Sequence, residues 1–359
     1  LFDYQKVIFP DDLPLNKIAL VSISFKRVSD WNGKEPIIDL DRIKNAISIT
    51  HSIGKPFRFW ATPDTEVAWK ALYDLGVDFI NTDMVNELAS YRRSTNGLHA
   101  QDQAAMSFNI RYDNSDDGEN RWGLRKEGIV DLVRQYSPDF LGIQEGLHHQ
   151  VAYLDTVLTA YGFAGVGRDD GKTKGEYSAI FYHRKQVQLL LTQTYWLSET
   201  PDKVSVGWDA SMERIVTYGK FKNLMTNEIL HVFNCHFDHK GEQSRLNAAK
   251  LITELLDEKG IENEKLIVMG DLNCLSEDPP VLVLKQHLDD SYSDPDVLIY
   301  GPEGTWNGFN NQLSIERRID FILTKNLRVS QYMHLDERRD DNLFLSDHLP
   351  VLVRYGKAR

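Results

Sequence analysis

The stretch Lys265-Leu-Ile-Val-Met-Gly-Asp-Leu-Asn273 ends a short apolar run with an acidic and an amide side chain. Nearer the C-terminus, Ser346-Asp-His348 adjoins a second apolar run. Short apolar runs beside turn residues are typical of buried strands, so these polar side chains should lie where strands emerge at the edge of a sheet. Strand ends hold side chains rigidly. The two motifs together therefore predict one metal-assisted phosphoryl-transfer site.

Length and composition allow one large globular domain or two smaller ones. The chain has 359 residues, 42% of them hydrophobic, which is ordinary for a globular protein. No run approaches the roughly 18 consecutive apolar residues that cross a bilayer, so we expect no membrane-spanning segment. Cys235 and Cys274 are too few for a disulfide scaffold, and we expect two packed thiols, with a single bridge as the alternative.

The negative charge is concentrated in the larger, C-terminal part of the chain. The net charge is −12 at pH 7, yet residues 1–95 hold 12 basic and 13 acidic side chains, so −11 belongs to the rest. Proteins that grip long nucleic acids cluster Lys and Arg against the phosphates, and the sequence has no such run. This balance favours a small phosphate ester as the substrate and makes nucleic acid a less favoured partner.

The N-terminal part has the pattern of a small βα segment. Apolar runs predict strands at residues 18–25, 56–60 and 77–82, and helices at residues 40–49, 65–75 and 85–91. Asp64 or Thr65 can cap the second helix. Residues 93–104 are polar, small and without periodicity, which predicts a linker between a segment at residues 1–92 and a domain at residues 105–359.

Two stretches of this segment resemble a known family. Lys55-Pro-Phe-Arg-Phe-Trp-Ala-Thr-Pro-Asp64 and Leu75-Gly-Val-Asp-Phe-Ile-Asn-Thr-Asp83 resemble the last barrel units of glycerophosphodiester phosphodiesterases and related phospholipases, which are TIM barrels. The segment lacks the early His-Arg-Gly and Glu-containing stretches that carry that family's catalysis. The resemblance implies part of a barrel with no active site of its own, and by association a phospholipid head-group substrate. The alternative is a small α/β domain that packs on its neighbour.

The second part has a different pattern. Apolar runs predict strands at residues 105–110, 140–143, 177–183, 214–221, 229–236 and 266–269, and helices at residues 122–135 and 243–257. Apolar strands with a few helices and no internal repeat predict an α/β fold in which two packed mixed sheets are flanked by helices. We therefore expect a four-layer α/β sandwich.

Six motifs follow one another along this part: Ser107-Phe-Asn-Ile-Arg111, Ile143-Gln-Glu145, Asn234-Cys-His236, Gly270-Asp-Leu-Asn273, Arg318-Ile-Asp-Phe-Ile322 and Ser346-Asp-His348. Their order resembles the endonuclease/exonuclease/phosphatase superfamily, the fold of deoxyribonuclease I-like nucleases and inositol polyphosphate 5-phosphatases. Gly118-Glu-Asn-Arg-Trp122, Trp196-Leu-Ser-Glu-Thr-Pro201 and Gly207-Trp-Asp209 resemble a bacterial subgroup. That subgroup favours an extracytoplasmic or secreted bacterial protein, whereas the substrate and the oligomeric state do not follow from it.

The superfamily's chemistry implies a divalent cation. In-line attack of water on a phosphate ester requires neutralised phosphoryl oxygens and a stabilised leaving oxygen. Mg²⁺ or Mn²⁺ supplies that charge and needs few protein ligands, because such ions keep several waters. The resemblance implies Glu145 as the primary ligand, with Asn109 and Asp347 completing or orienting its coordination shell. The alternative for Glu145 is a surface carboxylate.

Asp271 and Asn273 close the apolar strand quoted first. We expect Asp271 to orient or deprotonate the attacking water. Asn273 lies on the same face because strand side chains alternate, and we expect it to bind a phosphoryl oxygen or help place that water. The alternative is an Asx turn, in which the two side chains cap the loop backbone.

Two histidines carry the remaining implied roles. The resemblance implies that His348 contacts the scissile phosphate and that Asp320 hydrogen-bonds it, which favours the charged imidazolium. It also implies that His236 lies near the leaving group or the phosphate. Because Asp238 and His239 follow His236, a zinc site is an alternative, although the spacing differs from that of helix-borne zinc motifs.

Contacts to the rest of the substrate are expected from Arg214, Arg245 and Tyr177. Either arginine can clamp a nonreacting phosphate, with a surface ion pair as the alternative. Tyr177 precedes an apolar run and resembles the start of a substrate-side strand, with core packing as the alternative.

These residues predict a divalent-metal-dependent phosphoric ester hydrolase, either a phosphodiesterase or a phosphatase. A nuclease acting on short single-stranded nucleic acid is the alternative within enzymes. A catalytically silent binding module is the alternative outside them. The expected catalytic positions are all filled, which favours an enzyme, and the acidic charge disfavours the nuclease.

Overall fold

The computed structural model describes residues 2–10, 17–34, 36–53, 55–94, 103–312 and 314–356. The chain divides into two units, Leu1–Gln101 and Asp102–Arg359. Residues 95–102 of the predicted linker lie outside the described residues. The ends of that linker belong to regular structure, since helix α3 (Val85–Ser94) includes residues 93–94 and strand β5 (Gln103–Asn109) includes residues 103–104.

The N-terminal unit is built on a parallel sheet. Its strands are hydrogen-bonded in the order β1 (Phe2–Tyr4), β2 (Ile18–Ser24), β3 (Phe57–Trp60) and β4 (Phe79–Ile80), and its other helices are α1 (Leu40–His51) and α2 (Glu66–Asp74). Thr65 caps α2, because its side chain accepts a hydrogen bond from the Ala68 N–H. Parallel strands that neighbour each other in sequence order are also the arrangement within a TIM barrel.

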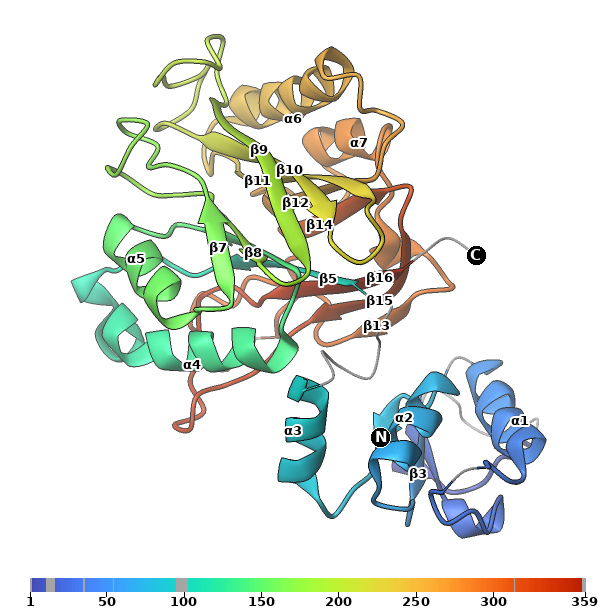
Figure 1. The fold of residues 1–359 in the computed structure, drawn as a ribbon. Coiled ribbons are helices and arrows are strands. Elements are labelled where there is room, and N and C mark those ends of the chain that lie inside the picture. Colours follow the sequence, from blue (N-terminus) through green and yellow to red (C-terminus); the bar gives the residue numbers. More distant parts are fainter. Residues whose placement is uncertain are drawn as a thin grey trace. The chain divides into compact units, whose positions relative to one another are not determined.

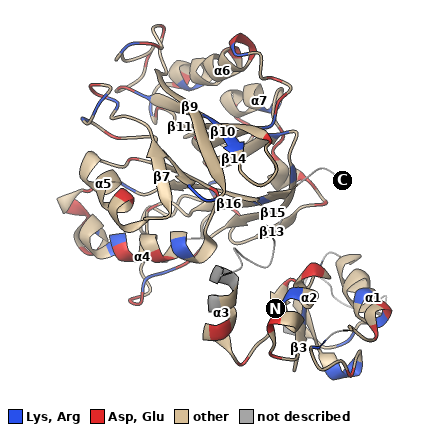
Figure 2. Ribbon diagram, in the orientation of Figure 1, with Lys and Arg blue, Asp and Glu red and all other residues tan. Residues whose placement is uncertain are grey.

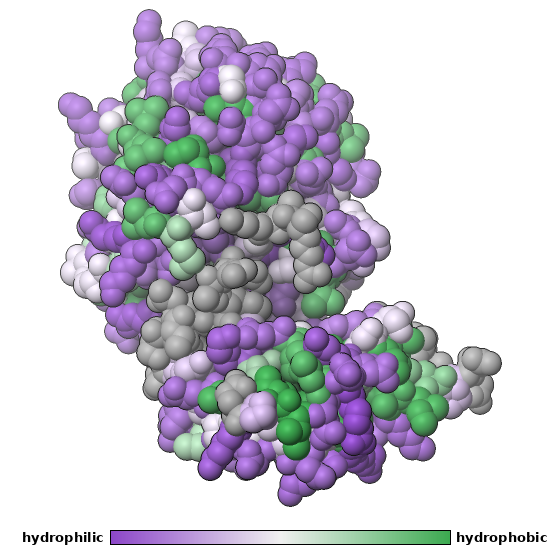
Figure 3. Space-filling view, turned by 45° about the vertical axis from the view of Figure 1, so that its right-hand side comes forward, coloured by the Kyte–Doolittle hydropathy of each residue, from purple (hydrophilic) through white to green (hydrophobic). Residues whose placement is uncertain are grey.

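One aromatic core and several exposed apolar side chains characterise this unit. Phe25 and Phe57 each meet Phe59 edge to face inside the core. Figure 3 shows hydrophobic patches on the surface of the unit, where Ile8 and Val85 are 76% and 66% exposed. The edge strands are short, with three residues in β1 and two in β4, which limits the unpaired backbone at the edges of the sheet.

Two mixed sheets form the C-terminal unit. The larger has the strand order β13 (Leu298–Tyr300), β15 (Arg328–His334), β16 (Val351–Gly356), β5, β6 (Phe140–Gln144), β8 (Ile180–His183) and β7 (Tyr161–Ala164). The smaller has the order β14 (Asp320–Lys325), β12 (Leu266–Asp271), β11 (Ile229–His236), β10 (Ile215–Asn223) and β9 (Val187–Trp196). The helices are α4 (Trp122–Tyr136), α5 (His148–Val157), α6 (Glu242–Glu258) and α7 (Pro279–Lys285).

Three apolar clusters divide this unit into four layers. The cluster between the sheets joins Phe140 and Ile180 of the larger sheet to Phe221 and Ile267 of the smaller. A second cluster packs α4 and α5 against the larger sheet, and a third packs α6 and α7 against the smaller. Figure 1 shows these two pairs of helices on opposite sides of the paired sheets. The predicted four-layer α/β sandwich is therefore confirmed.

Strand register brings the polar motifs to one edge of this sandwich. Parallel pairing of β11 with β12 sets His236 opposite Asp271, and antiparallel pairing of β12 with β14 sets Asp271 opposite Asp320. Gly270 permits the close approach, since its φ is 149° and a Cβ there would lie 1.9 Å from the Cys235 carbonyl oxygen. The glycine of the Gly-Asp-Leu-Asn motif is thus required by the backbone beside the site.

The cysteines and the helices bear on two expectations from composition. Cys235 and Cys274 are both buried and free, so the prediction of packed thiols rather than a bridge is confirmed. Burial raises the pKa of Cys274 to about 12. Within the described parts of the chain, none of the helices combines the length and the hydrophobicity that crossing a bilayer requires.

Candidate active site

Polar side chains from both sheets meet at one end of the sandwich. In the larger sheet, Asn109 ends β5 and Glu145 directly follows β6. In the smaller sheet, His236 ends β11, Asp271 ends β12 and Asp320 begins β14. Strands β5 and β6 are parallel, as are β11 and β12, so each pair delivers the side chains at its carboxyl ends together.

Asp271 is the centre of this cluster. Its Oδ2 lies 3.0 Å from Asn109 Nδ2, 3.3 Å from His236 Nε2 and 3.8 Å from His348 Nε2. Burial raises the pKa of Asp271 to about 7; His348 opposes this increase and the Asp320 carboxylate adds to it. A carboxyl group with that pKa can accept a proton near neutral pH.

His348 and Asp320 form a buried pair supported by a threonine. His348 Nδ1 lies 2.8 Å from Asp320 Oδ2, which also accepts a hydrogen bond from Thr305 Oγ1 at 2.6 Å. Burial lowers the pKa of His348, but the charges of Asp320 and Asp271 outweigh it and hold that pKa well above its usual value. The predicted contact between His348 and Asp320 is therefore present, and the imidazolium is the favoured form.

Glu145 and Asp347 lie on either side of Arg111. Arg111 Nη1 is 3.9 Å from Glu145 Oε2 and 3.9 Å from Asp347 Oδ2. Asn109 Nδ2 donates to Glu145 Oε1 at 3.0 Å as well as to Asp271, and so links the two carboxylates. Burial raises the pKa of Asp347 and the Glu145 charge raises it further, against the positive charges of His348 and Arg111. This end of the cluster gathers negative charge that a cation can neutralise.

Glu145, Asp347 and Asn109 offer oxygen atoms, the ligands that Mg²⁺ and Mn²⁺ prefer. Glu145 accepts hydrogen bonds from Asn109 Nδ2 and from the Tyr112 N–H, which leaves lone pairs on both carboxylate oxygens. A second group in the described residues, made of Asp271, Asp320 and His348, also has ligand atoms within 4.8 Å of one another. In that group the histidine already contacts a carboxylate through Nδ1, and hard cations prefer oxygen ligands. The Glu145 set therefore stays our prediction for the cation.

Three residues of the site have left-handed backbones. The φ angle is 63° at Glu145, 54° at Arg111 and 48° at Asn273. Each follows a strand of the site within two residues, so the chain turns sharply where the strand ends. A non-glycine residue in this region costs on the order of 1–3 kcal/mol and persists where the surroundings enforce it, which is common at functional sites.

His236 lies between Asp271 and Asn273. Its Nε2 is 3.2 Å from Asn273 Nδ2. Burial lowers the pKa of His236 well below its usual value, and the charges of Arg214 and Arg168 lower it further, so the neutral ring is favoured. The backbone N–H of Asn273 donates to Asp271 Oδ1 at 2.9 Å, so an Asx-turn contact coexists with the contacts of the cluster.

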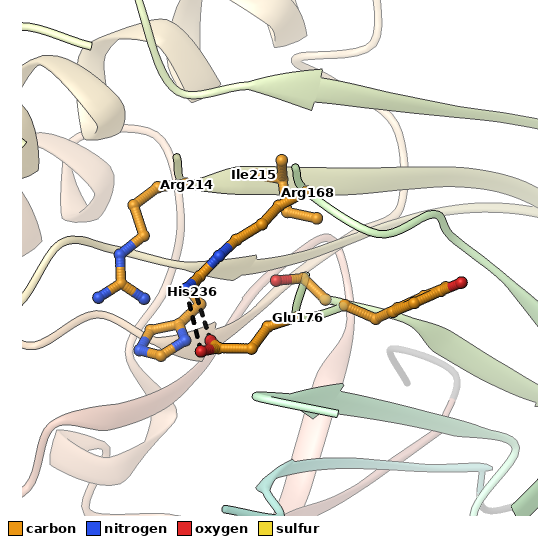
Figure 4. Close-up of a pocket in the computed structure, with 7 residues that line it drawn as sticks. Arg168, Glu176, Arg214, Ile215 and His236 are labelled. Carbon is orange, nitrogen blue, oxygen red and sulfur yellow. Dashed lines mark hydrogen bonds and ion pairs between the residues drawn. The ribbon is translucent and has the colours of Figure 1, made fainter. Parts of the chain in front are cut away.

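A small pocket opens beside His236. Its other lining residues are Arg168, Glu176, Tyr177, Ser178, Arg214 and Ile215 (Figure 4). Arg214 and Tyr177, two of the predicted substrate contacts, therefore adjoin the cluster. Arg245, the third, is not part of this lining, and its Nη1 donates to the Asp238 carbonyl at 3.1 Å.

Asp238 and His239, which together with His236 suggested the alternative zinc site, contact Arg214. Arg214 Nε donates to Asp238 Oδ1 at 3.3 Å, and Arg214 Nη2 lies 2.9 Å from His239 Nδ1. As far as the structure describes the chain, His236, Asp238 and His239 do not gather as a metal-binding group. The geometry therefore gives these two neighbours of His236 a supporting role around the arginine.

Several residues at the site received no role from the sequence. Arg111 stands inside a quoted motif, whereas Arg168 and Glu176 come from the glycine-rich loop before β8. Arg125 is fully buried, and its Nη1 donates to the carbonyls of Ile110 and Leu345 at 2.8 Å each. It thereby joins the loop after β5 to the loop before β16. Arg125 acts through segments that are distant in the sequence, and Arg168 pairs with Glu176 within one loop, so apart from the motif around Arg111 no sequence motif assigns these roles.

The profile of the Endonuclease/Exonuclease/phosphatase family matches residues 106–348, a span that contains the cluster and the pocket. The chain therefore belongs to the endonuclease/exonuclease/phosphatase family, whose members are phosphoesterase hydrolases. The predicted resemblance of this part is confirmed. In the N-terminal unit, the profile of the Glycerophosphoryl diester phosphodiesterase family matches residues 56–85.

Solved structures of bacterial proteins resemble the C-terminal unit closely. An endonuclease/exonuclease/phosphatase from Bacteroides vulgatus is 34% identical with a TM-score of 0.67, over 72% of this chain and 99% of that one. The mannosyl-6-phosphatase Bt3783 of Bacteroides thetaiotaomicron is 36% identical with a TM-score of 0.67, over 70% and 99%. An uncharacterised protein of Acanthamoeba polyphaga mimivirus is 26% identical over 161 residues, which are 43% of this chain and 59% of that relative.

Proposed function

We propose that the C-terminal unit hydrolyses a phosphate ester with the help of Mg²⁺ or Mn²⁺, as a phosphodiesterase or a phosphatase. The observation that carries this proposal is the position of Asp271. Its carboxylate is linked through Asn109 to Glu145 on one side and lies within 4 Å of two histidines on the other, at 3.3 and 3.8 Å. A proton acceptor, a cation site and phosphate-binding groups are the parts that in-line water attack requires.

In this mechanism Asp271 orients the attacking water and takes its proton. The raised pKa of Asp271 suits that role, because a base is most effective when its pKa lies near the working pH. Asn273 helps to place the water or binds a phosphoryl oxygen. Its strained backbone and its contact with His236 fix its position beside Asp271.

His348 stabilises the negative charge on the scissile phosphate. Asp320 keeps the ring charged and oriented, so that Nε2 is the atom left to donate to a phosphoryl oxygen. His236 lies 3.3 Å from Asp271, and its neutral ring can donate an N–H hydrogen bond to the leaving group or to the phosphate. The two histidines thus differ in charge: carboxylate charges outweigh burial at His348, whereas burial and the charges of Arg214 and Arg168 act in the same direction at His236.

Glu145 would be the primary ligand of the cation, and Asp347 and Asn109 would complete or orient the shell. A bound divalent cation supplies positive charge to the phosphoryl oxygens and to the leaving oxygen. Arg111 contacts the same two carboxylates at 3.9 Å each, and its own position is fixed by hydrogen bonds of Nε and Nη2 to Asp117, at 3.1 Å each. Arg214 and Tyr177, with Arg245 further away, contact the substrate beyond the reacting phosphate.

A substrate screen tests the proposal. The purified chain is stripped with a chelator, reloaded with Mg²⁺ or Mn²⁺, and assayed on aryl phosphate mono- and diesters, sugar and inositol phosphates, glycerophosphodiesters and short oligonucleotides. We expect turnover that the chelator abolishes and either ion restores, and that Asp271→Asn removes. The matched control is Asp131→Asn, an exposed carboxylate on α4. Full turnover in chelator would contradict the metal dependence. No turnover of any ester would favour the alternative of a catalytically silent binding module.

The same screen distinguishes a hydrolase of small phosphate esters from the nuclease alternative. In the view of Figure 2, Lys and Arg of the C-terminal unit are dispersed among acidic residues instead of forming one stripe. A protein that follows a nucleic acid backbone concentrates basic residues along it. We therefore expect small esters to be turned over faster than oligonucleotides, and the opposite ranking would establish the nuclease.

Two further proposals concern the N-terminal unit and the location of the protein. We infer that residues 1–92 are a partial barrel without an active site of their own, and its parallel strands and the profile match at residues 56–85 support this. We also infer an extracytoplasmic location from the resemblance to a bacterial subgroup. Fractionation of the source cells tests the location, and assays of glycerophosphodiesters with Asp271→Asn test whether any activity belongs to the N-terminal unit.

A further inference from the structure

Arg111 lies between two residues that would hold the cation, yet it hydrogen-bonds to neither of them. Its Nη1 is 3.9 Å from Glu145 Oε2 and 3.9 Å from Asp347 Oδ2. A hydrogen bond from a guanidinium to a carboxylate is about 2.7–2.9 Å long, so both contacts are electrostatic only. The guanidinium therefore brings a positive charge to the proposed cation site without a hydrogen bond to either ligand.

Other contacts hold the guanidinium of Arg111 in this position. Its Nε and Nη2 both donate to Asp117 at 3.1 Å, and the group lies over the ring of Tyr112, 4.3 Å from the centroid. The backbone is held as well, because the N–H donates to Asn109 Oδ1 at 3.0 Å and the carbonyl accepts from Arg125 Nη2 at 3.2 Å. The positive charge is therefore a fixed part of the site.

The two carboxylates have supports of their own. Glu145 accepts hydrogen bonds from a side-chain amide and from a backbone N–H, at 3.0 and 3.2 Å. The backbone carbonyl of Asp347 accepts from the N–H groups of Asn307 and Gly308, at 2.9 and 3.1 Å. Replacing Arg111 by a neutral residue would therefore remove charge from the site and leave these supports in place.

The charge of Arg111 opposes binding of a divalent cation at this place. Glu145 and Asp347 attract a cation, and a guanidinium beside them offsets part of that attraction. Asp117 reduces the effect without removing it, because it bonds to Nε and Nη2 and leaves Nη1 as the end that faces the two ligands. A phosphate dianion has the opposite influence, since its charge compensates both the cation and the guanidinium and its oxygens can accept from Nη1.

We propose that Arg111 couples binding of the divalent cation to binding of the phosphate. Without phosphate, its charge keeps the affinity of the protein for the cation low. With phosphate, the same charge favours the complex of protein, cation and phosphate. The inference rests on the proposed function, because it takes Glu145 and Asp347 as ligands of the cation. The protein therefore takes up the cation together with its substrate, and by linkage the cation tightens phosphate binding by the same factor.

Titrations with Mn²⁺ test this inference, with inorganic phosphate as the second ligand. Free Mn²⁺ is followed by its electron paramagnetic resonance signal, and the same titrations without protein correct for complexes of Mn²⁺ with phosphate. In the wild type we expect phosphate to tighten Mn²⁺ binding about tenfold, the size of a typical coupling between two ligands. Without phosphate, Arg111→Gln should bind Mn²⁺ about tenfold more tightly than the wild type, and phosphate should then tighten it roughly threefold or less.

Two further variants separate charge from structure. Arg111→Lys keeps the charge but cannot form the bidentate pair with Asp117, so its affinity for Mn²⁺ should stay closer to the wild type than to Arg111→Gln. Arg134→Gln removes an exposed arginine of α4 and should keep the wild-type affinity. If Arg111 only supported the ligands structurally, both substitutions of Arg111 would weaken Mn²⁺ binding.

Three results would overturn the inference while the proposed hydrolysis of phosphate esters stands. These are weaker or unchanged Mn²⁺ binding in Arg111→Gln, equal tightening in Arg134→Gln, and wild-type binding of Mn²⁺ that phosphate does not change. If neither the wild type nor Arg111→Gln binds Mn²⁺ with or without phosphate, the inference is overturned together with the metal dependence of the proposed function. If Arg111→Gln fails to fold, the effect of phosphate on the wild type and on Arg111→Lys decides.

Discussion

The two units of the chain bury polar groups in different ways. In the described part of the N-terminal unit, the buried polar side chains are the hydroxyls of Ser22, Ser24, Ser29 and Thr50, with the carboxylate of Asp78. The C-terminal unit instead buries Asp271, Asp320, His236 and His348 next to one another. Burying ionisable groups costs free energy unless partners compensate it. Both units have strands and helices, but among the described residues it is the C-terminal unit that concentrates buried charge at its strand ends, and the proposal that it holds the chemistry rests on this difference.

The largest expected effect comes from neutralising the centre of that charge. Asp271→Asn keeps the size of the side chain but removes the proton acceptor, so kcat should fall roughly 100- to 10,000-fold. Steady-state kinetics with saturating Mg²⁺ measure the loss, and thermal melting shows whether the variant is folded. Residual activity within threefold of the wild type would mean that another group takes the proton. It would also mean that the buried charge of the C-terminal unit does not mark the site of the reaction.

The second test compares two glycines with positive φ, one in each unit. A Cβ at Gly270 would lie 1.9 Å from a backbone oxygen of the neighbouring strand, whereas at Gly76, after α2, a Cβ would meet nothing within 4 Å. Gly270→Ala should therefore lose about 3 kcal/mol or more of unfolding free energy, by overpacking and backbone strain together. Gly76→Ala should lose about 1 kcal/mol, from the backbone alone. Chemical denaturation measures both, and equal losses would contradict the clash at Gly270.

The sequence predicted the sandwich because its central strands are continuous apolar runs, such as that ending at Asp271. It did not predict β9, an edge strand whose outward side chains are largely exposed, so that its pattern lacks the burial signal of a central strand. Which site residues could be predicted also depended on whether a local sequence pattern marks them. Residues at strand ends inside motifs, such as Glu145 and His348, received predicted roles from the sequence. Arg125 donates to carbonyls of loops that are distant in the sequence, and Arg168 pairs with Glu176 within one loop; no local pattern specifies those contacts.

The third test uses acid to probe a buried histidine of the C-terminal unit. His231 lies on β11 and contacts the Tyr218 hydroxyl at 2.8 Å, and burial lowers its pKa to about 4. An unfolded histidine titrates near pH 6.5, so between about pH 6.5 and 4 the unfolded state binds the proton more tightly. Stability is therefore lost as the pH falls through this window, by on the order of 1–2 kcal/mol at pH 5.

Denaturation at pH 7 and pH 5 checks this linkage in the wild type and in His231→Gln, which cannot take up the proton. We expect a smaller acid-induced loss in the variant. The comparison between the two pH values is made within each protein, so any constant cost of the substitution cancels. Identical losses in both proteins would show that His231 is not a source of the acid sensitivity.

The smallest effect on activity is expected from Asp78, a buried carboxylate in the described part of the N-terminal unit. Asp78 Oδ2 accepts a hydrogen bond from the Phe57 N–H at 2.6 Å and lies 2.8 Å from His51 Nε2, so it ties β3 to the loop before β4 and to α1. Asp78→Asn should cost about 1 kcal/mol of local stability, the size of one weakened hydrogen bond. Hydrogen exchange of residues 57–60 measures that cost. If the unit has no part in the chemistry, kcat and KM stay at the wild-type values, in contrast to Asp271→Asn. A loss of kcat in a variant whose C-terminal unit melts normally would place the N-terminal unit in the mechanism, because a purely local change in hydrogen bonding cannot otherwise reach the cluster around Asp271.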